Sequence, residues 1–281
     1  MGNYTRDSEK MGAPGLAHGG PSLIGPNDPP PVSIINEQGT GRLLLVGDHV
    51  SNTIPAAMDN LGLEEMILQQ HVAYDIGTRQ VLHYLSQQLN APAVLAGYSR
   101  LLVDLNRSPE DPTLIPEQSD TVAIPGNQGL TREEKAQRVH SFYLPYRAAI
   151  DRHLLHFRRR GIVPAFICIH SFTPEMAGQT RPWQIGLMWD KDPRIALPLL
   201  KSLRAHPNGI IVGDNLPYSG KHQADYTIDH HAESTGLPHI AIEIRQDLIA
   251  TEEKAVQWGR ILSESLRDIL ADPTLYQVWE G

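Results

Sequence analysis

Residues 43–55, LLLVGDHVSNTIP, constrain the fold more than any other part of the sequence. Four consecutive apolar residues, 43–46, run directly into Gly47, Asp48 and His49. An unbroken apolar run that ends in glycine is typical of a strand covered on both faces, as in a parallel or mixed α/β sheet. The pattern recurs at residues 163–174, VPAFICIHSFTP, where a second apolar run leads to His170. Because ligands bind beyond the carboxyl ends of the strands in such sheets, the two histidines are predicted to share one site.

The overall composition indicates a chain that folds without disulfides or a partner. Of its 281 residues, 41% are hydrophobic, which is enough for a full core. The formal net charge of -8 argues against a nucleic-acid-binding protein, which would normally carry a basic face. The start of the sequence lacks an apolar core of signal-peptide length, and no stretch approaches the roughly 20 apolar residues of a membrane span. Cys168, the sole cysteine, lies in an apolar run and is expected to be an inert buried thiol, so we expect a cytoplasmic protein.

Strand-like and helix-like segments alternate along the chain, which predicts a single α/β domain over residues 31–281. Residues 1–30 are rich in Gly and Pro and are predicted to form a flexible or draped N-terminal arm. The expected strands cover residues 43–46, 93–98, 100–105, 166–169, 184–188, 209–212 and 239–245. The expected helices cover residues 76–90, 132–159, 194–205 and 252–270.

Local signals refine this outline. Thr131 and Glu134 have the spacing of a capping box for the helix at 132–159, and Pro145 is expected to kink that helix. Residues 108–127 form a proline-rich polar stretch, and a loop of that length is usually functional, often as a lid or a site wall.

Three residues have the placement expected of metal ligands. A catalytic metal site usually combines three protein ligands with one water. His49 and His170 stand at strand ends, and Asp75 stands at the start of the following helix. Asp75 is equally compatible with a helix N-cap, a role that aspartate often fills. A second cluster, which more often would be solvated than metal-bound, consists of His222, His230, His231 and His239.

Glu243 is an unusual residue because it lies inside the apolar strand PHIAIEIRQDL. A lone carboxylate in such a strand is costly unless it is paired or functional. Burial and nearby charge could adapt it to act as a general base toward a metal-bound water. It could also form an ion pair with Arg245, which is two residues further on the same strand face.

The segment SRLLVDLNRSP offers a clamp for an anionic substrate. Arginine binds carboxylates through two parallel hydrogen bonds and asparagine adds an amide donor, so Asn106 and Arg107 are candidates for this role. The sequence contains no G-x-S-x-G elbow, no P-loop and no H-E-x-x-H motif, so serine-hydrolase and nucleotide chemistry are unsupported.

Taken together, these segments resemble the N-formylglutamate amidohydrolase family. The matching motifs occur in the family's order between about residues 40 and 250: GDHVSNTIP, AYDIGT, SRLLVDLNRSP, IPGN, YLPYRAAI, CIHSFTP and YTIDHHAESTGLPHIAIEIRQDLI. The resemblance implies a three-layer α/β/α sandwich with a mixed, mostly parallel central sheet, similar to that of the zinc exopeptidases. Aspartoacylase, succinylglutamate desuccinylase and muramoyl-alanine amidases belong to the same broad group.

The resemblance also implies roles for the candidate residues. One Zn²⁺ per chain would be held by His49, Asp75 and His170. Glu243 would be the general base and acid, and Arg100 or Arg245 would stabilise the oxyanion. Asn106 and Arg107, together with Ser51, would bind the substrate. The His-x-x-Glu pattern of the carboxypeptidases is absent, because position 52 is Asn52.

The implied reaction is hydrolysis of a small anionic N-acyl amino acid, N-formyl-L-glutamate, to formate and glutamate. Two alternatives remain open at this stage. One is a metal-dependent amidase that acts on another N-acyl amino acid or on a cell-wall-like peptide. The other is a noncatalytic binding protein that retains the fold.

Overall fold

The structure is a computed structural model that describes residues 22–221 and 225–280. Its centre is a seven-stranded sheet in the order β1-β3-β2-β6-β11-β9-β10. In that order the strands are β1 (Val32–Ile35), β3 (Ala93–Ala96), β2 (Leu43–Gly47), β6 (Ala165–Phe172), β11 (His239–Arg245), β9 (Ile185–Met188) and β10 (Val212–Asp214). The pairs β2–β3, β2–β6, β6–β11 and β9–β10 are parallel, whereas β1–β3 and β9–β11 are antiparallel. This confirms the predicted mixed, mostly parallel sheet.

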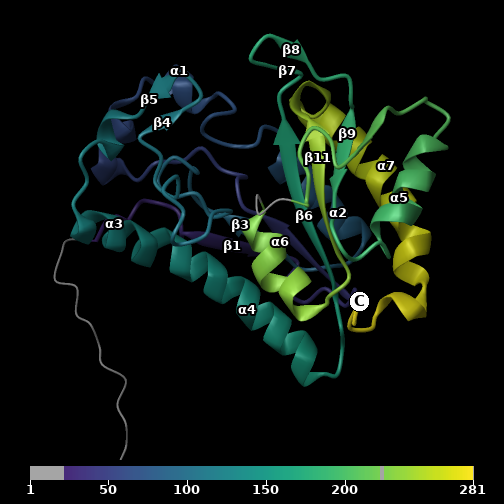
Figure 1. The fold of residues 1–281 in the computed structure, drawn as a ribbon. Coiled ribbons are helices and arrows are strands. Elements are labelled where there is room, and N and C mark those ends of the chain that lie inside the picture. Colours follow the sequence, from purple (N-terminus) through teal and green to yellow (C-terminus); the bar gives the residue numbers. More distant parts are fainter. Residues whose placement is uncertain (1–21, 222–224, 281) are drawn as a thin grey trace, which may run out of the picture.

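Helices cover both faces of the sheet, which gives the expected three layers (Figure 1). One helical layer contains α2 (Thr78–Gln88), α5 (Ala196–Arg204) and α7 (Glu252–Ala271). Helices α2 and α5 contact the sheet, and α7 packs against both of them. The other contains α4 (Leu144–Arg159) and α6 (Tyr226–His231). No helix in the described residues is both long enough and apolar enough to cross a membrane.

The sequence pattern explains the layers. All residues of β2, β3 and β9 are buried, as expected for strands sandwiched between helices. On α2, Val81, Leu82 and Leu85 are buried at helical spacing, while the opposite side of this helix faces solvent. The core therefore lies between the sheet and the two helical layers.

Two expected strands differ from the structure. Residues 100–105 form turns, although Leu101, Leu102 and Val103 are fully buried. They pack into the core without belonging to a strand, and an apolar run looks the same in sequence in either case. The strand expected at 209–212 begins only at Val212 and extends to Asp214.

The long predicted helix is present but divided. The capping box is confirmed, because Thr131 Oγ1 accepts a hydrogen bond from the Glu134 amide at 3.2 Å and Glu134 accepts one from the Thr131 amide at 2.8 Å. Helix α3 (Arg132–Arg138) continues through the π-helical segment η3 (Val139–Tyr143) into α4. Pro145 lacks an amide N–H, so it cannot bond to the carbonyl four residues earlier, and the wide π turn accommodates this defect.

The long loop at 108–127 contains regular structure. It holds a small hairpin of β4 (Gln118–Ser119) and β5 (Val122–Ala123), followed by the 3₁₀ turn η2 (Pro125–Asn127). The buried Asn127 amide donates to the Leu101 carbonyl at 2.8 Å and to the Pro116 carbonyl at 2.6 Å. The remaining short elements are η1 (Ala56–Gly62), α1 (Glu65–Leu68), β7 (Glu175–Met176), β8 (Gln179–Thr180), η4 (Glu233–Thr235), η5 (Gln246–Leu248) and η6 (Pro273–Leu275).

Most of the predicted N-terminal arm, residues 1–21, lies outside the described residues. The part that follows is attached to the domain. Asp28 accepts a hydrogen bond from the Ala56 amide at 3.1 Å, and the Pro29 carbonyl accepts one from the Tyr98 hydroxyl. The boundary near residue 30 stays a prediction.

Candidate functional site

The site lies where β2, β6 and β11 run side by side. β2 and β6 are parallel, so His49, two residues after β2, and His170, near the end of β6, lie at the same edge of the sheet. β11 is also parallel to β6, and its register places Glu243 directly opposite His170. The sheet topology alone therefore brings these three side chains together.

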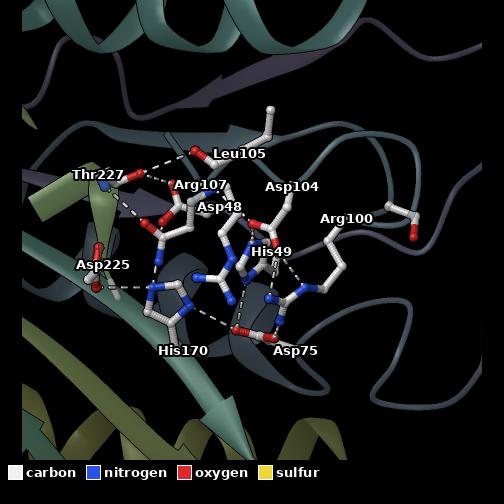
Figure 2. A network of polar contacts seen from close by, with 12 residues as sticks. Asp48, His49, Asp75, Arg100, Asp104, Leu105, Arg107, His170, Asp225 and Thr227 are labelled. Carbon is white, nitrogen blue, oxygen red and sulfur yellow. Dashed lines mark hydrogen bonds and ion pairs between the residues drawn. The ribbon is translucent and has the colours of Figure 1, made fainter. Parts of the chain in front are cut away.

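Asp75 completes a cluster of donors with the two histidines (Figure 2). Its Oδ2 lies 2.9 Å from His170 Nδ1 and 3.5 Å from His49 Nδ1, and all three side chains are buried. His49 Nδ1 has no hydrogen-bond partner, although it is fully enclosed. Two imidazole nitrogens and a carboxylate oxygen are a donor set that suits zinc, and an orphaned ring nitrogen in such a cluster fits a metal ligand.

The outer nitrogen of each histidine also has a partner. His49 Nε2 lies 2.8 Å from Asp104 Oδ1, and His170 Nε2 lies 3.1 Å from Cys168 Sγ. Metal-binding histidines usually donate their second ring N–H to a carboxylate or similar acceptor, which fixes the ring orientation. Arg100 in turn donates to Asp104 through Nη2 at 2.7 Å and Nε at 3.1 Å.

A second group of donors, Asp48, Cys168 and His170, shares one histidine with the first. Here the Asp48 carboxylate already accepts hydrogen bonds from Tyr146 at 2.7 Å and from Thr227 at 3.1 Å. Because its oxygens are occupied while His49 Nδ1 is not, the geometry favours a metal between His49, Asp75 and His170.

Asp75 does not cap helix α2. The residue at the N-cap of α2 is Gly77, and no side chain caps this helix. The Asp75 carboxylate faces the two histidines instead. Burial alone would raise its pKa, but the neighbouring His49 and His170 hold the pKa of Asp75 well below its usual range.

Glu243 faces the same cavity of about 180 Å³ as the donor cluster. The cavity is lined by His49, Asp75, Arg100, Asn106, Arg107, His170, Ser171, Met188, Tyr218, Asp225 and Glu243. Only 7% of Glu243 is exposed, and its Oε2 atom has no hydrogen-bond partner. Burial raises the pKa of Glu243 to about 7; His170 and Arg100 oppose this shift, while Asp75 and Asp225 add to it. A carboxyl group with these properties can exchange protons near neutral pH.

Asn106 and Arg107 both reach this cavity, as expected for a clamp. The Asn106 oxygen accepts a hydrogen bond from the Thr227 amide at 2.9 Å, which fixes the orientation of the side-chain amide. The amide NH₂ is therefore the group that can donate to an anion. Together with the Arg107 guanidinium it offers hydrogen-bond donors to an anion.

Two predicted residues lie elsewhere. Ser51 donates to the Gly97 carbonyl at 2.8 Å and lines a neighbouring hollow, which shares Asp75 with the main cavity. Arg245 pairs with Asp247 at 2.8 Å rather than with Glu243, and it does not line the cavity.

The second histidine cluster is not assembled at this site. His222 lies outside the described residues. His231 Nδ1 lies 3.2 Å from Asp151, and His239 Nε2 lies 3.6 Å from Glu233. Neither lines the cavity that contains Glu243.

Asp48, Tyr146 and Thr227 surround the donors without a role predicted from the sequence, and Asp104, which the SRLLVDLNRSP segment offers beside Asn106 and Arg107, lies behind His49. Asp104 has the same sequence signal as Glu243, because it is a carboxylate within an apolar run, LLVDL. Cys168 was expected to be an inert thiol, yet its sulfur contacts both His170 and Asp48.

Comparison with known proteins gives three findings. A protein-family model described as N-formylglutamate amidohydrolase matches residues 41–250. The crystal structure of a gene product from Agrobacterium tumefaciens is similar, with 32% identity, a TM-score of 0.85, and coverage of 89% of this chain and 98% of that one. The crystal structure of N-formylglutamate amidohydrolase from Ralstonia eutropha has 19% identity and a TM-score of 0.65, covering 85% of this chain and 97% of that one, and this likeness concerns the fold. No curated protein matched the sequence.

Proposed function

Because this chain belongs to the N-formylglutamate amidohydrolase family, we propose that it is a zinc-dependent amidohydrolase that cleaves N-formyl-L-glutamate to formate and glutamate. The observation that supports this proposal best is the position of Glu243. Its unpartnered carboxylate oxygen shares a small cavity with the donor cluster and with Asn106 and Arg107. A proton acceptor, a metal-binding set and an anion clamp are the parts that this hydrolysis needs.

His49, Asp75 and His170 would hold the zinc ion. When bound, zinc polarises a carbonyl oxygen and lowers the pKa of water toward neutrality. Glu243 takes the proton from the water that attacks the formyl carbon, and the C–N bond breaks as Glu243 returns this proton to the leaving amine nitrogen. Arg100 lines the cavity and is the better placed of the two candidate arginines to stabilise the oxyanion, since Arg245 lies outside it.

The substrate carboxylates would be bound by Arg107 and the Asn106 amide. This contact orients the scissile bond relative to Glu243 and explains how a chain with a net charge of -8 binds an anion. The small volume of the inner cavity, about 180 Å³, is suited to a short acyl group.

The proposal is tested first by elemental analysis of the untagged protein. We expect about one zinc per chain, lost in His170→Ala and retained in His83→Ala, a histidine exposed on α2. Wild-type protein that is isolated without metal and fails to take up zinc would contradict the proposal.

Release of formate and glutamate is then measured on a substrate panel. N-formyl-L-glutamate should be hydrolysed with a higher kcat/KM than N-acetyl-L-glutamate, N-formylated neutral amino acids or cell-wall-like peptides. Faster hydrolysis of another member would assign the chain to a different amidase activity. Tight binding without turnover on any of them would identify a noncatalytic binding protein.

A further inference from the structure

Asp48 is a fully buried carboxylate that neither the proposed metal set nor the substrate clamp uses. It follows β2 directly, has no solvent-exposed surface and does not line the substrate cavity. A carboxylate this deeply buried is costly unless it is hydrogen-bonded or paired. Its surroundings therefore show what it does.

Three donors from three different elements converge on this carboxylate. Oδ1 accepts from the Tyr146 hydroxyl of α4 at 2.7 Å and from the Thr227 hydroxyl of α6 at 3.1 Å. Oδ2 accepts from the Cys168 thiol of β6 at 3.2 Å. All three donors are neutral, so they stabilise the anion without cancelling its charge.

Asp48 also contacts His170. Within the described residues its one ion-pair contact runs from Oδ2 to His170 Nε2, at 3.5 Å. Cys168 Sγ lies between them, 3.1 Å from the same ring nitrogen. The thiol donates to Asp48, so the sulfur can accept from His170 Nε2 in the tautomer that carries its hydrogen on Nε2. Asp225 Oδ2 lies 3.7 Å from the same ring nitrogen and favours the same tautomer. The contacts form a chain from imidazole through thiol to carboxylate.

This chain determines which nitrogen of His170 faces the donor cluster. A hydrogen on Nε2 that points toward Cys168 and Asp48 leaves Nδ1, 2.9 Å from Asp75, as the atom that can bind a cation (Figure 2). His49 has the same arrangement on its own side, with Asp104 behind Nε2. Each histidine therefore has an acidic residue near its Nε2 atom, Asp104 for His49 and Asp48 for His170.

We propose that Asp48 is a positioning residue for metal binding, which acts on His170 through the Cys168 thiol. The inference rests on the proposed metal-dependent function. A purely structural Asp48 would tie α4 and α6 to the sheet and would affect stability alone. A positioning residue also changes the metal affinity of the folded protein, commonly 10- to 100-fold.

The test measures the zinc dissociation constant by chelator competition in variants whose circular dichroism shows the native fold. We expect Asp48→Asn to weaken zinc binding about 10- to 100-fold and to alter the visible spectrum of the cobalt-substituted protein. Cys168→Ala should weaken zinc binding, whereas Cys168→Ser, which keeps a hydroxyl relay, should recover most of the affinity. The matched control is Asp192→Asn, another buried carboxylate, which pairs with Arg194 away from the site and should lower stability while leaving the zinc affinity unchanged.

The outcomes separate this inference from the proposed function. Absence of zinc binding in the wild type would overturn both. Zinc bound by the wild type, and bound within twofold as tightly by folded Asp48→Asn, would overturn only the role of Asp48. If Asp48→Asn does not fold, the two Cys168 variants decide. Equal zinc affinity in Cys168→Ala and Cys168→Ser would then overturn the role of Asp48.

Discussion

Glu243 of β11 and His170 of β6 are direct partners across a parallel strand pair. Their side chains lie on the same face of the sheet, because side chains of aligned residues on neighbouring strands point the same way. The proposed base is consequently fixed next to a proposed metal ligand by backbone hydrogen bonds rather than by a mobile loop. Such a fixed arrangement suits proton transfer, which needs reacting groups held at hydrogen-bond distance.

Glu243→Gln removes the proton acceptor while keeping the size of the side chain. We expect kcat to fall by about 100- to 10,000-fold, because an amide cannot take a proton from the attacking water. Zinc content should stay near that of the wild type, since Glu243 is outside the donor cluster. The control is Glu233→Gln, which removes a partly buried glutamate that pairs with Lys191. A kcat near normal in Glu243→Gln would remove Glu243 from the mechanism.

Arg107, the proposed clamp residue, and Arg245, which lies outside the cavity, give different expectations. Arg107→Ala should raise KM for N-formyl-L-glutamate by about 10- to 100-fold, the effect of losing a charge-assisted hydrogen bond. KM for a neutral N-formyl amide should change far less. Arg245→Ala is the matched control, because this arginine pairs with Asp247 outside the cavity. Equal losses on anionic and neutral substrates would contradict the clamp.

The sheet could be predicted from sequence because its central strands are buried on both faces and therefore appear as continuous apolar runs. The same signal failed at residues 100–105. Leu101 and Leu102 are as deeply buried as strand residues, but the chain turns there and they belong to no strand. Apolarity reports burial, whereas strand pairing depends on neighbours that are distant in sequence.

Individual residues of the candidate site could be predicted from the sequence, but their partners could not. Glu243 stood out because a carboxylate in an apolar strand is costly, and His49 and His170 stood out because both end apolar runs. Their roles stay predictions, although the structure brings all three side chains together with Asp75. The partner behind each histidine could not be predicted, because the contacts of His49 with Asp104 and of His170 with Asp48 join segments that only the fold brings together.

Gly77, the N-cap residue of α2, lies between Asp75 and this helix at a position that only glycine fits without strain. Its φ is 84°, and a Cβ atom there would lie 2.1 Å from the Ile249 carbonyl oxygen. Gly77→Ala should lower the free energy of unfolding by about 3 kcal/mol, from the left-handed backbone and the backbone clash together. The measurement is urea denaturation of the metal-free protein.

The control for this change is Gly161→Ala. Gly161 also has a positive φ, 67°, but no atom lies within 4 Å of the added Cβ. We expect a loss of only about 1 kcal/mol there, from the backbone conformation alone. Because Gly77 is two residues from Asp75, its variant should also bind zinc more weakly, which Gly161→Ala should not. Equal losses of stability would show that contact with Ile249 has no influence.

We expect His231 to make stability depend on pH at a place outside the candidate site. Burial, together with the positive charges of Arg147 and His230, lowers the pKa of His231 to about 3. Asp151 lies 3.2 Å away and favours the charged form, but its side chain is 63% exposed and screened by water, so burial dominates. The folded protein thus keeps His231 neutral at pH values where the unfolded chain protonates it.

The sign of the effect follows from this difference in bound protons. Below the ordinary pKa of 6.5 the unfolded chain binds one proton more than the folded protein, so stability is full above pH 6.5 and is lost as the pH falls toward about 3. One proton corresponds to a slope of about 1.4 kcal/mol per pH unit within that window. His231→Gln cannot titrate, so its free energy of unfolding should fall less steeply on acidification than that of the wild type. Denaturant titrations at several pH values between 6.5 and 3 measure both slopes, and parallel curves would show that His231 is protonated equally in the folded and unfolded states.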